Sequence, residues 1–153
     1  MTEQIRRADA VWNGNLLSGS GTITRVTSGA FSDLPVTWAA RTEDHGGRTS
    51  PEELLAAAHA SCFSMQLSSF LAKAGHQPER LEVSAEVIFR KLEAGWKVAE
   101  SRLTVRGRVP GISEEEFRSH AERAKEGCPI SSALAGNVEL SVEASLTQAA
   151  SVA

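Results

Sequence analysis

A long helix, predicted over residues 51–74, constrains the fold of this chain more than any other feature. Ser50 is placed to be its N-cap, Pro51 takes the first helical position, and Glu53 follows three residues after the serine, as in a capping box. Gly75 is suited to end the helix. Because apolar or small side chains occur on nearly every side, we expect this helix to lie at the centre of the fold, covered all round.

Segments of alternating polar and apolar residues surround this helix and predict β-strands. The expected strands cover residues 5–12, 21–27, 36–41, 81–90, 96–109 and 138–146. The apolar phase of the fifth strand shifts between Val98 and Leu103, which predicts a β-bulge there.

Two shorter helices are expected after the fifth strand. Ser113 and Glu116 form a second capping-box pattern at the start of a charged helix, and a short helix follows the turn at Cys128. No internal repeat and no linker interrupt the chain. Strands and helices in this order predict one α+β domain over residues 1–147, followed by a disordered tail over residues 148–153.

The composition is that of an ordinary globular protein. The 153 residues include 41% hydrophobic and 23% charged residues, which suits one domain or one subunit of a small oligomer. The net charge of −3 argues against nucleic acid as a partner, because phosphate binding needs a basic surface. No apolar segment follows residues 1–7, and polar side chains interrupt residues 54–71. We therefore expect no signal peptide and no membrane span, and we predict a cytoplasmic location.

The histidines do not predict a metal site. The four of them, His45, His59, His76 and His120, are widely spaced and match no metal-binding signature. Nucleotide-binding motifs are missing from the sequence as well, so we expect neither a metal nor another cofactor.

Two cysteines, Cys62 and Cys128, are the candidates for chemistry. Counted alone, each is more simply explained as a small buried hydrophobic residue. Cys62 lies about three turns into the long helix, where the helix dipole no longer favours a thiolate, so its activation needs a cation from elsewhere. Arg41, at the end of the predicted strand over residues 36–41, is one candidate, and a solvated arginine at a strand end is the alternative.

Cys128 looks the more reactive cysteine by local rules. It precedes Pro129 at a helix start, where unpaired backbone N–H groups favour a thiolate, but a capping and packing role explains it equally well. His59 lies three residues before Cys62 on the same helix face, which is compatible with a Cys–His pair or with packing. Local physics does not decide which cysteine attacks first.

Glu52 carries a geometric constraint. It lies ten residues before Cys62 on the same helix, which separates them by about 15 Å along the axis. Within one chain Glu52 therefore cannot touch Cys62, and a role in a site there requires a second copy of the helix. Small side chains such as Ala57 and Ser61 would allow two such helices to approach closely. The alternative is a first-turn carboxylate that the helix dipole favours.

Three segments carry a resemblance to a known family. Residues 50–54 (SPEEL), 57–64 (AAHASCFS) and 124–131 (AKEGCPIS), together with compatible strands over almost the whole chain, resemble the OsmC/Ohr family of bacterial peroxiredoxin-like proteins. The resemblance implies an α+β fold in which antiparallel sheets wrap a long central helix. It also implies an intertwined homodimer with active sites at the interface.

The resemblance further implies a role for four residues. Cys62 matches the peroxidatic cysteine, Cys128 the resolving cysteine, Glu52 the active-site glutamate, and Arg41 the arginine as the OsmC branch places it. The implied activity is the reduction of organic hydroperoxides, and more weakly of hydrogen peroxide, in oxidative and osmotic stress defence. An external dithiol, a dihydrolipoyl protein by resemblance, would restore the thiols.

Two further expectations concern the substrate and the rival function. We expect an apolar pocket lined by residues such as Phe63 and Met65 to favour alkyl hydroperoxides. The alternative to an enzyme is a non-enzymatic redox sensor or ligand-binding stress protein on the same fold.

Overall fold

The computed structural model describes residues 1–148, in which three strands are followed by two helices, two strands, two helices and a last strand. By their internal contacts these residues belong to two units, Met1–Leu54 and Leu55–Ala153, and each is described by itself. The α+β class is confirmed. Of the disordered tail predicted for residues 148–153, all but the first residue lies outside the described part.

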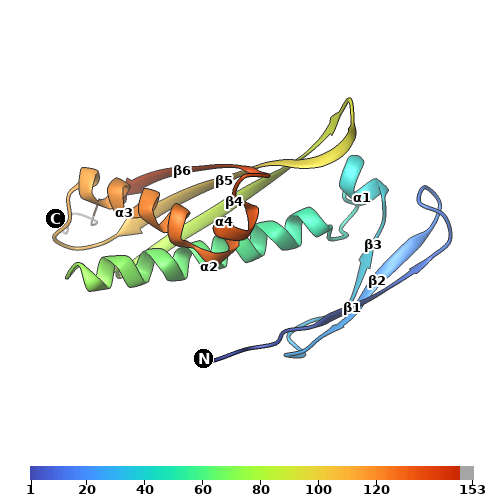
Figure 1. Ribbon diagram of the computed structural model, residues 1–153, viewed down its shortest axis with the longest axis horizontal. Helices are drawn as coiled ribbons and strands as arrows, with labels where there is room; N and C mark the ends of the chain where they lie inside the picture. The colour runs from blue at the N-terminus through green and yellow to red at the C-terminus, as the bar shows by residue number, and fades with distance from the viewer. Residues whose placement is uncertain (149–153) are drawn as a thin grey trace, which may run out of the picture. The chain divides into compact units, whose positions relative to one another are not determined.

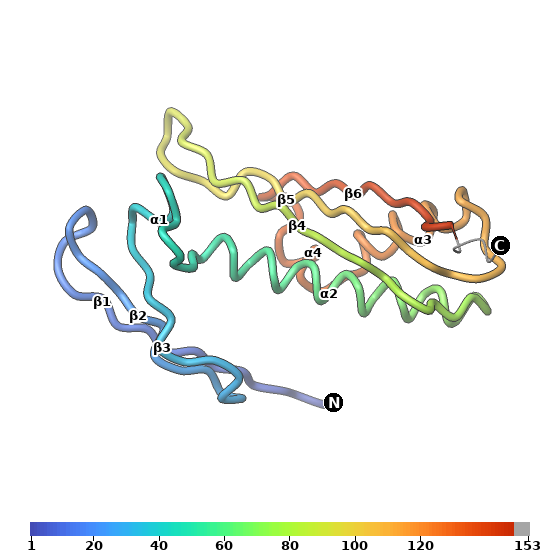
Figure 2. The backbone as a smooth tube through the Cα atoms, turned by 180° about the vertical axis from the view of Figure 1, so that it is seen from behind, coloured from blue at the N-terminus to red at the C-terminus, as the bar shows by residue number. Residues whose placement is uncertain are grey.

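Three antiparallel strands form the sheet of the N-terminal unit. They are β1 (Ala8–Asn13), β2 (Ser20–Val26) and β3 (Ser32–Val36), in the order β1-β2-β3 (Figures 1 and 2). In the loop between β1 and β2, the Asn15 side chain accepts hydrogen bonds from the backbone N–H groups of Leu17 and Ser18. The Asn15 side chain thus accepts the hydrogen bonds of backbone N–H groups that have no partner strand inside the turn.

The predicted strand over residues 36–41 is wrong beyond its first residue. The chain leaves the sheet at Val36 and forms a single helical turn, α1 (Ala39–Thr42), which contains Arg41. The Thr37 hydroxyl accepts a hydrogen bond from the backbone N–H of Ala40 at 3.1 Å. Threonine side chains that bond to a nearby backbone N–H in this way favour a helix start over a continuing strand.

The long helix is confirmed as α2 (Pro51–Lys73), and one of the two hydrogen bonds of the predicted capping box forms at its N-terminus. The Ser50 hydroxyl accepts the backbone N–H of Glu53 at 3.1 Å, while the Glu53 carboxylate accepts a hydrogen bond from the Thr49 hydroxyl. By length and composition α2 could also cross a membrane, a test that core helices of water-soluble proteins pass too.

The expectation that α2 is covered all round is wrong for the single chain. A stripe with a spacing of four residues is fully buried, and the residues on the other side are exposed. Met65, for example, is 68% exposed. The buried stripe consists of His59, Phe63, Leu67 and Leu71, and the exposed positions include Ala57, Ser61, Met65 and Ala72.

The sheet of the C-terminal unit is mixed. The strands β4 (Arg80–Leu92) and β5 (Gly95–Arg108) pair antiparallel, and β6 (Glu139–Leu146) joins β5 in parallel. The expected antiparallel pairing is confirmed for β1 with β2, β2 with β3 and β4 with β5, and β6 adds one parallel edge strand. Parallel neighbours need a crossover connection, and here α3 (Glu114–Gly127) and α4 (Pro129–Leu134) provide it.

Local predictions for this unit are largely confirmed. Ile88 pairs with Glu100 and Phe89 with Val98, so Ala99 is the extra residue of the predicted bulge. The capping box at the start of α3 is complete.

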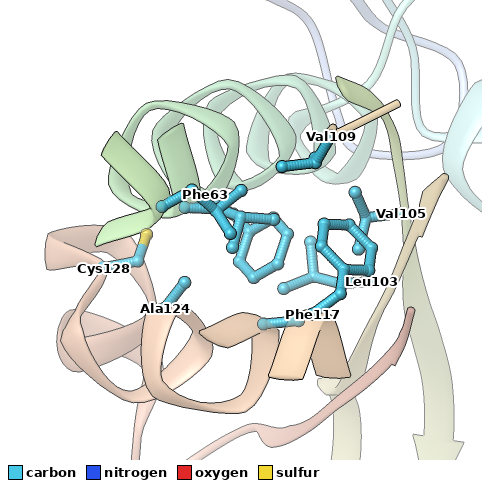
Figure 3. Close-up of a cluster of buried hydrophobic side chains, with 10 residues drawn as sticks. Phe63, Leu103, Val105, Val109, Phe117, Ala124 and Cys128 are labelled. Atoms are coloured by element: carbon cyan, nitrogen blue, oxygen red, sulfur yellow. The ribbon is translucent and has the colours of Figure 1, made fainter. Parts of the chain in front are cut away.

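The core of the C-terminal unit lies where α2, β5 and α3 meet (Figure 3). It contains Phe63, Leu67 and Leu71 of α2, Leu103 and Val105 of β5, Phe117, Ala121 and Ala124 of α3, and Cys128, all at most 1% exposed. Gly107 is required by this packing, because a Cβ atom there would lie 2.5 Å from Cζ of Phe117. The core thereby places Cys128 next to α2.

Candidate active site

Arg41 and Glu52 form a bidentate ion pair within the N-terminal unit. Nη2 of Arg41 lies 2.6 Å from Oε1 of Glu52, and Nε donates to both carboxylate oxygens at 3.2 Å. The glutamate side chain is 9% exposed and the arginine side chain 28%. The pair arises because α1 presents the arginine to the first turn of α2. A guanidinium held at two points by a carboxylate keeps a fixed orientation.

The guanidinium of Arg41 also borders an apolar pocket. Its Cζ atom lies 5.3 Å from the ring centre of Trp38, a cation–π arrangement. The pocket has a volume of about 330 Å³ and is lined by Trp12, Leu16, Val36, Thr37, Trp38, Arg41 and Pro51. A cation at the edge of an apolar pocket can bind a molecule that joins a hydrocarbon part to an oxygen-rich end.

A pocket shared by Phe63 and Met65 is not formed. Phe63 is fully buried in the core, whereas Met65 is 68% exposed on the opposite side of α2. Two residues apart on a helix, they point in different directions, so the expectation of a substrate pocket lined by both is wrong.

Cys62 and Cys128 lie together in the C-terminal unit, and both are free thiols. Cys128 is fully buried, and Cys62 packs against the same core. Burial raises the pKa of the Cys62 thiol, and a hydrogen bond that this thiol makes to Cys128 raises it further. The backbone N–H of Ile130 opposes both by donating to the Cys62 sulfur, which lowers the pKa.

The neighbours that shift the pKa of Cys62 are thus a thiol and a backbone N–H, and neither is a cation. The expected activation of Cys62 by a cation stays a prediction. One of the N–H groups expected to favour a Cys128 thiolate, that of Ile130, bonds to Cys62 instead. Cys128 is the N-cap of α4 but makes no side-chain capping bond there, while the N–H of Ile130 serves Cys62.

His59 does not pair with Cys62. Its Nδ1 lies 2.7 Å from Oγ of Ser101, and its Nε2 lies 2.7 Å from Oγ of Ser131. Both ring nitrogens are therefore occupied, and burial lowers the pKa of the imidazole, which keeps it neutral. Neither serine was predicted as a functional residue. Ser131 stands three residues after Cys128 in the motif at residues 124–131, but nothing local marks Ser101 on β5.

The structure thus brings the predicted site residues together in two pairs, Arg41 with Glu52 and Cys62 with Cys128. Within residues 1–148, no group of three or more His, Cys, Asp and Glu side chains could hold a metal ion. The two free cysteines can carry out thiol chemistry, and the arginine offers a positive charge.

Two curated relatives cover much of the chain. Peroxiredoxin OsmC of Escherichia coli (strain K12) is 37% identical over 135 residues, which cover 88% of this chain and 93% of that relative. The organic hydroperoxide resistance protein OhrA of Bacillus subtilis is 34% identical over 97 residues, 62% of this chain and 66% of that relative.

Solved structures agree on the fold. The organic hydroperoxide resistance protein OhrB of Bacillus subtilis has a TM-score of 0.68 at 25% identity and covers 90% of this chain and 97% of its own. An organic hydroperoxide resistance protein from Elizabethkingia anophelis has a TM-score of 0.71 at 24% identity. The match covers 95% of this chain and 100% of that protein's chain. The family model described as OsmC-like protein matches residues 44–143. The chain therefore belongs to the OsmC-like protein family.

Proposed function

We propose that this protein is a cysteine-based peroxidase that reduces organic hydroperoxides to alcohols as part of oxidative stress defence. The observation that carries the proposal is the contact between two free thiols, Cys62 and Cys128, beside the N-terminus of α4. The names of the relatives, a peroxiredoxin and several organic hydroperoxide resistance proteins, support it. The proposed location is the cytoplasm.

The first half of the proposed cycle takes place at Cys62. Its thiolate attacks one oxygen of the hydroperoxide, an S–O bond forms, and the O–O bond breaks. The departing alkoxide takes up a proton and leaves as the alcohol, and Cys62 becomes a sulfenic acid.

The second half uses Cys128. Its thiolate attacks the Cys62 sulfur, an S–S bond forms, and the S–O bond breaks. The hydroxide takes up the proton released by Cys128 and leaves as water. An external dithiol, which we propose to be a dihydrolipoyl protein, then reduces the disulfide by thiol–disulfide exchange.

The activating cation in this proposal is Arg41, oriented by Glu52. Because ten residues of helix separate Glu52 from Cys62, the two cannot meet in one chain. The ion pair keeps Arg41 with Glu52, so we propose that both serve the Cys62 of a second subunit. The exposed side of α2 supports a homodimer, since its small residues permit close approach of a second copy.

The proposed substrate class follows from the pocket beside Arg41. Trp12, Leu16 and Trp38 supply an apolar wall, and the guanidinium stands at its edge. Burying a hydrocarbon group there contributes about 0.8 kcal/mol per methylene, an interaction that hydrogen peroxide cannot make. Alkyl and aryl hydroperoxides are therefore the preferred substrates.

A steady-state assay tests the proposal. Turnover is measured with cumene hydroperoxide and with hydrogen peroxide, each with a lipoamide-based and a thioredoxin-based reductant. We expect a higher kcat/KM for cumene hydroperoxide and faster turnover with the lipoamide system. Cys62→Ser should lose all turnover, while the matched variant Cys128→Ser should still consume the first equivalent of peroxide.

The opposite outcome identifies the rival function. A protein that is oxidised once at Cys62 and consumes no further peroxide in the presence of either reductant is a redox sensor. Full turnover by Cys62→Ser would exclude the cysteine mechanism altogether.

A further inference from the structure

A buried hydrogen-bond network centred on His59 joins three elements of the C-terminal unit. The histidine extends from α2, Ser101 from β5 and Ser131 from α4, and both ring nitrogens lie 2.7 Å from a serine oxygen. The three side chains are at most 1% exposed. In a neutral imidazole one nitrogen donates and the other accepts, so one serine accepts a hydrogen bond and the other donates one. All three polar groups are thereby satisfied without water.

The network is adjacent to both cysteines. His59 precedes Cys62 by three residues on α2, and Ser131 follows Cys128, the N-cap of α4, by three residues. Residues at this spacing on a helix lie on the same face. The bond between His59 and Ser131 therefore ties together the two elements that carry the sulfur atoms, about one turn away from each. The Ile130 N–H that contacts the Cys62 sulfur belongs to the same turn of α4.

We propose that His59 is a positioning residue for disulfide formation, which holds Ser131 and thereby keeps Cys128 beside Cys62 while Cys62 is a sulfenic acid. The proposal rests on the proposed function. The tether assists one step, the attack of the Cys128 thiolate on the Cys62 sulfur with loss of water. It does not take part in the preceding attack on the peroxide.

The network suits a positioning role better than proton transfer. A general base needs a free nitrogen near the proton that it removes, and both nitrogens of His59 are bonded to serines. A hydrogen bond between buried groups is also directional, unlike the apolar contacts that surround it. It can hold α4 in one register against α2, and Ser131 is the one fully buried residue of this six-residue helix.

Positioning has a chemical consequence at Cys62. A sulfenic acid can condense with Cys128, or a second peroxide can oxidise it to the sulfinic acid. The first reaction is intramolecular, and its rate depends on how often the Cys128 sulfur is within reach. Loosening α4 therefore favours the second reaction. It also weakens two contacts that act on the Cys62 thiol in opposite directions, since the bond to Cys128 raises its pKa and the bond from the Ile130 N–H lowers it, so the effect on the attack on peroxide should be small.

Two serine variants form a matched pair for the test. Ser131→Ala breaks the bond to α4, and Ser101→Ala breaks the bond to β5; each leaves one buried histidine nitrogen without a partner. The two variants should therefore lose a similar free energy of unfolding, because each leaves one buried nitrogen unpaired. Only Ser131→Ala removes the hydrogen bond that holds α4. Each reduced protein is mixed with one equivalent of cumene hydroperoxide, and mass spectrometry follows the disulfide, the dimedone-trapped sulfenic acid and the sulfinic acid.

We expect Ser131→Ala to form the disulfide about tenfold more slowly than the wild type, the factor that loss of one buried hydrogen bond can produce. It should accumulate trapped sulfenic acid and, with excess peroxide, sulfinic acid. Its rate of peroxide consumption in the first turnover should stay near the wild-type rate. Ser101→Ala should form the disulfide within about twofold of the wild-type rate.

A second pair of variants keeps the test valid if Ser131→Ala does not fold. His59→Gln places its amide near the position of Nε2, which bonds Ser131, and His59→Asn places it near Nδ1, which bonds Ser101. Disulfide formation should be close to normal in the glutamine variant and slow in the asparagine variant.

Equal rates of disulfide formation in both members of either pair would overturn the positioning role while leaving the peroxidase intact. Failure of the proposed function looks different, because the wild type itself would then form no sulfenic acid at Cys62.

Discussion

Replacing Arg41 with methionine tests the ion pair with Glu52 apart from any activity. Arg41→Met removes three contacts of 2.6 to 3.2 Å from a carboxylate whose side chain is 9% exposed. Removing one partner of a fully buried pair costs about 3–5 kcal/mol. Because the arginine side chain is 28% exposed, water can reach part of the freed carboxylate. We therefore expect the free energy of unfolding to fall by about 2 kcal/mol.

A double-mutant cycle isolates the interaction itself. Glu52→Gln keeps the shape of the side chain and removes its charge, so it should relieve most of the penalty in the Arg41→Met background. The expected coupling free energy between the two positions is about 1–2 kcal/mol.

Urea unfolding followed by tryptophan fluorescence is the assay, at one fixed protein concentration. A Trp96→Phe background leaves Trp12 and Trp38 as reporters, and both line the pocket that Arg41 borders. Additive effects of the two substitutions would show that the pair contributes nothing beyond its separate side chains. A loss below about 0.5 kcal/mol in Arg41→Met would refute the burial argument as well.

Two further predictions concern stability. Burial lowers the pKa of His59 below its ordinary value of 6.5, so below that pH the unfolded chain binds a proton that the folded protein excludes. The stability that this histidine contributes is therefore complete above pH 6.5 and declines on acidification. Urea unfolding at a series of pH values should show a shallower decline in the free energy of unfolding for His59→Gln. The same decline in both proteins would contradict the role of His59 in it. Gly107→Ala should destabilise the protein by about 1–3 kcal/mol in the same assay, since its Cβ atom would lie 2.5 Å from the ring of Phe117. In the control Gly127→Ala, the new Cβ atom would lie 3.3 Å from the ring of Phe70, which is only partly buried, and stability should change by less than about 1 kcal/mol. Equal losses in both variants would refute the packing argument.

Several features of the fold were predictable because they depend on neighbours along the chain. The N-cap of α2 at Ser50 and the capping box of α3 use side chains three residues apart, so their geometry follows from the local sequence. The bulge at Ala99 is visible as a change of phase in the alternation of one strand. The cysteine segments, 57–64 and 124–131, carry the family resemblance in the same local way.

Other features could not be read locally. The strand predicted over residues 36–41 fails because Thr37 bonds to the backbone of Ala40 once the chain has left the sheet. Alternation alone also does not state the direction of a neighbour, so the parallel pairing of β6 with β5 appears only when the crossover through α3 and α4 is formed.

In the helix α2, the local sequence determines some properties and tertiary packing determines others. Its length, its start and its wealth of small residues are properties of the sequence, since propensity and capping act within a few residues. Which stripe is buried, and which polar groups share that burial, depends on β5 and on α4, which lie far away along the chain. His59 shows the difference: the sequence places it beside Cys62, whereas tertiary packing commits both of its nitrogens to Ser101 and Ser131. A hydrogen bond across 42 or 72 residues has no local signature, because its geometry exists only after the chain has folded.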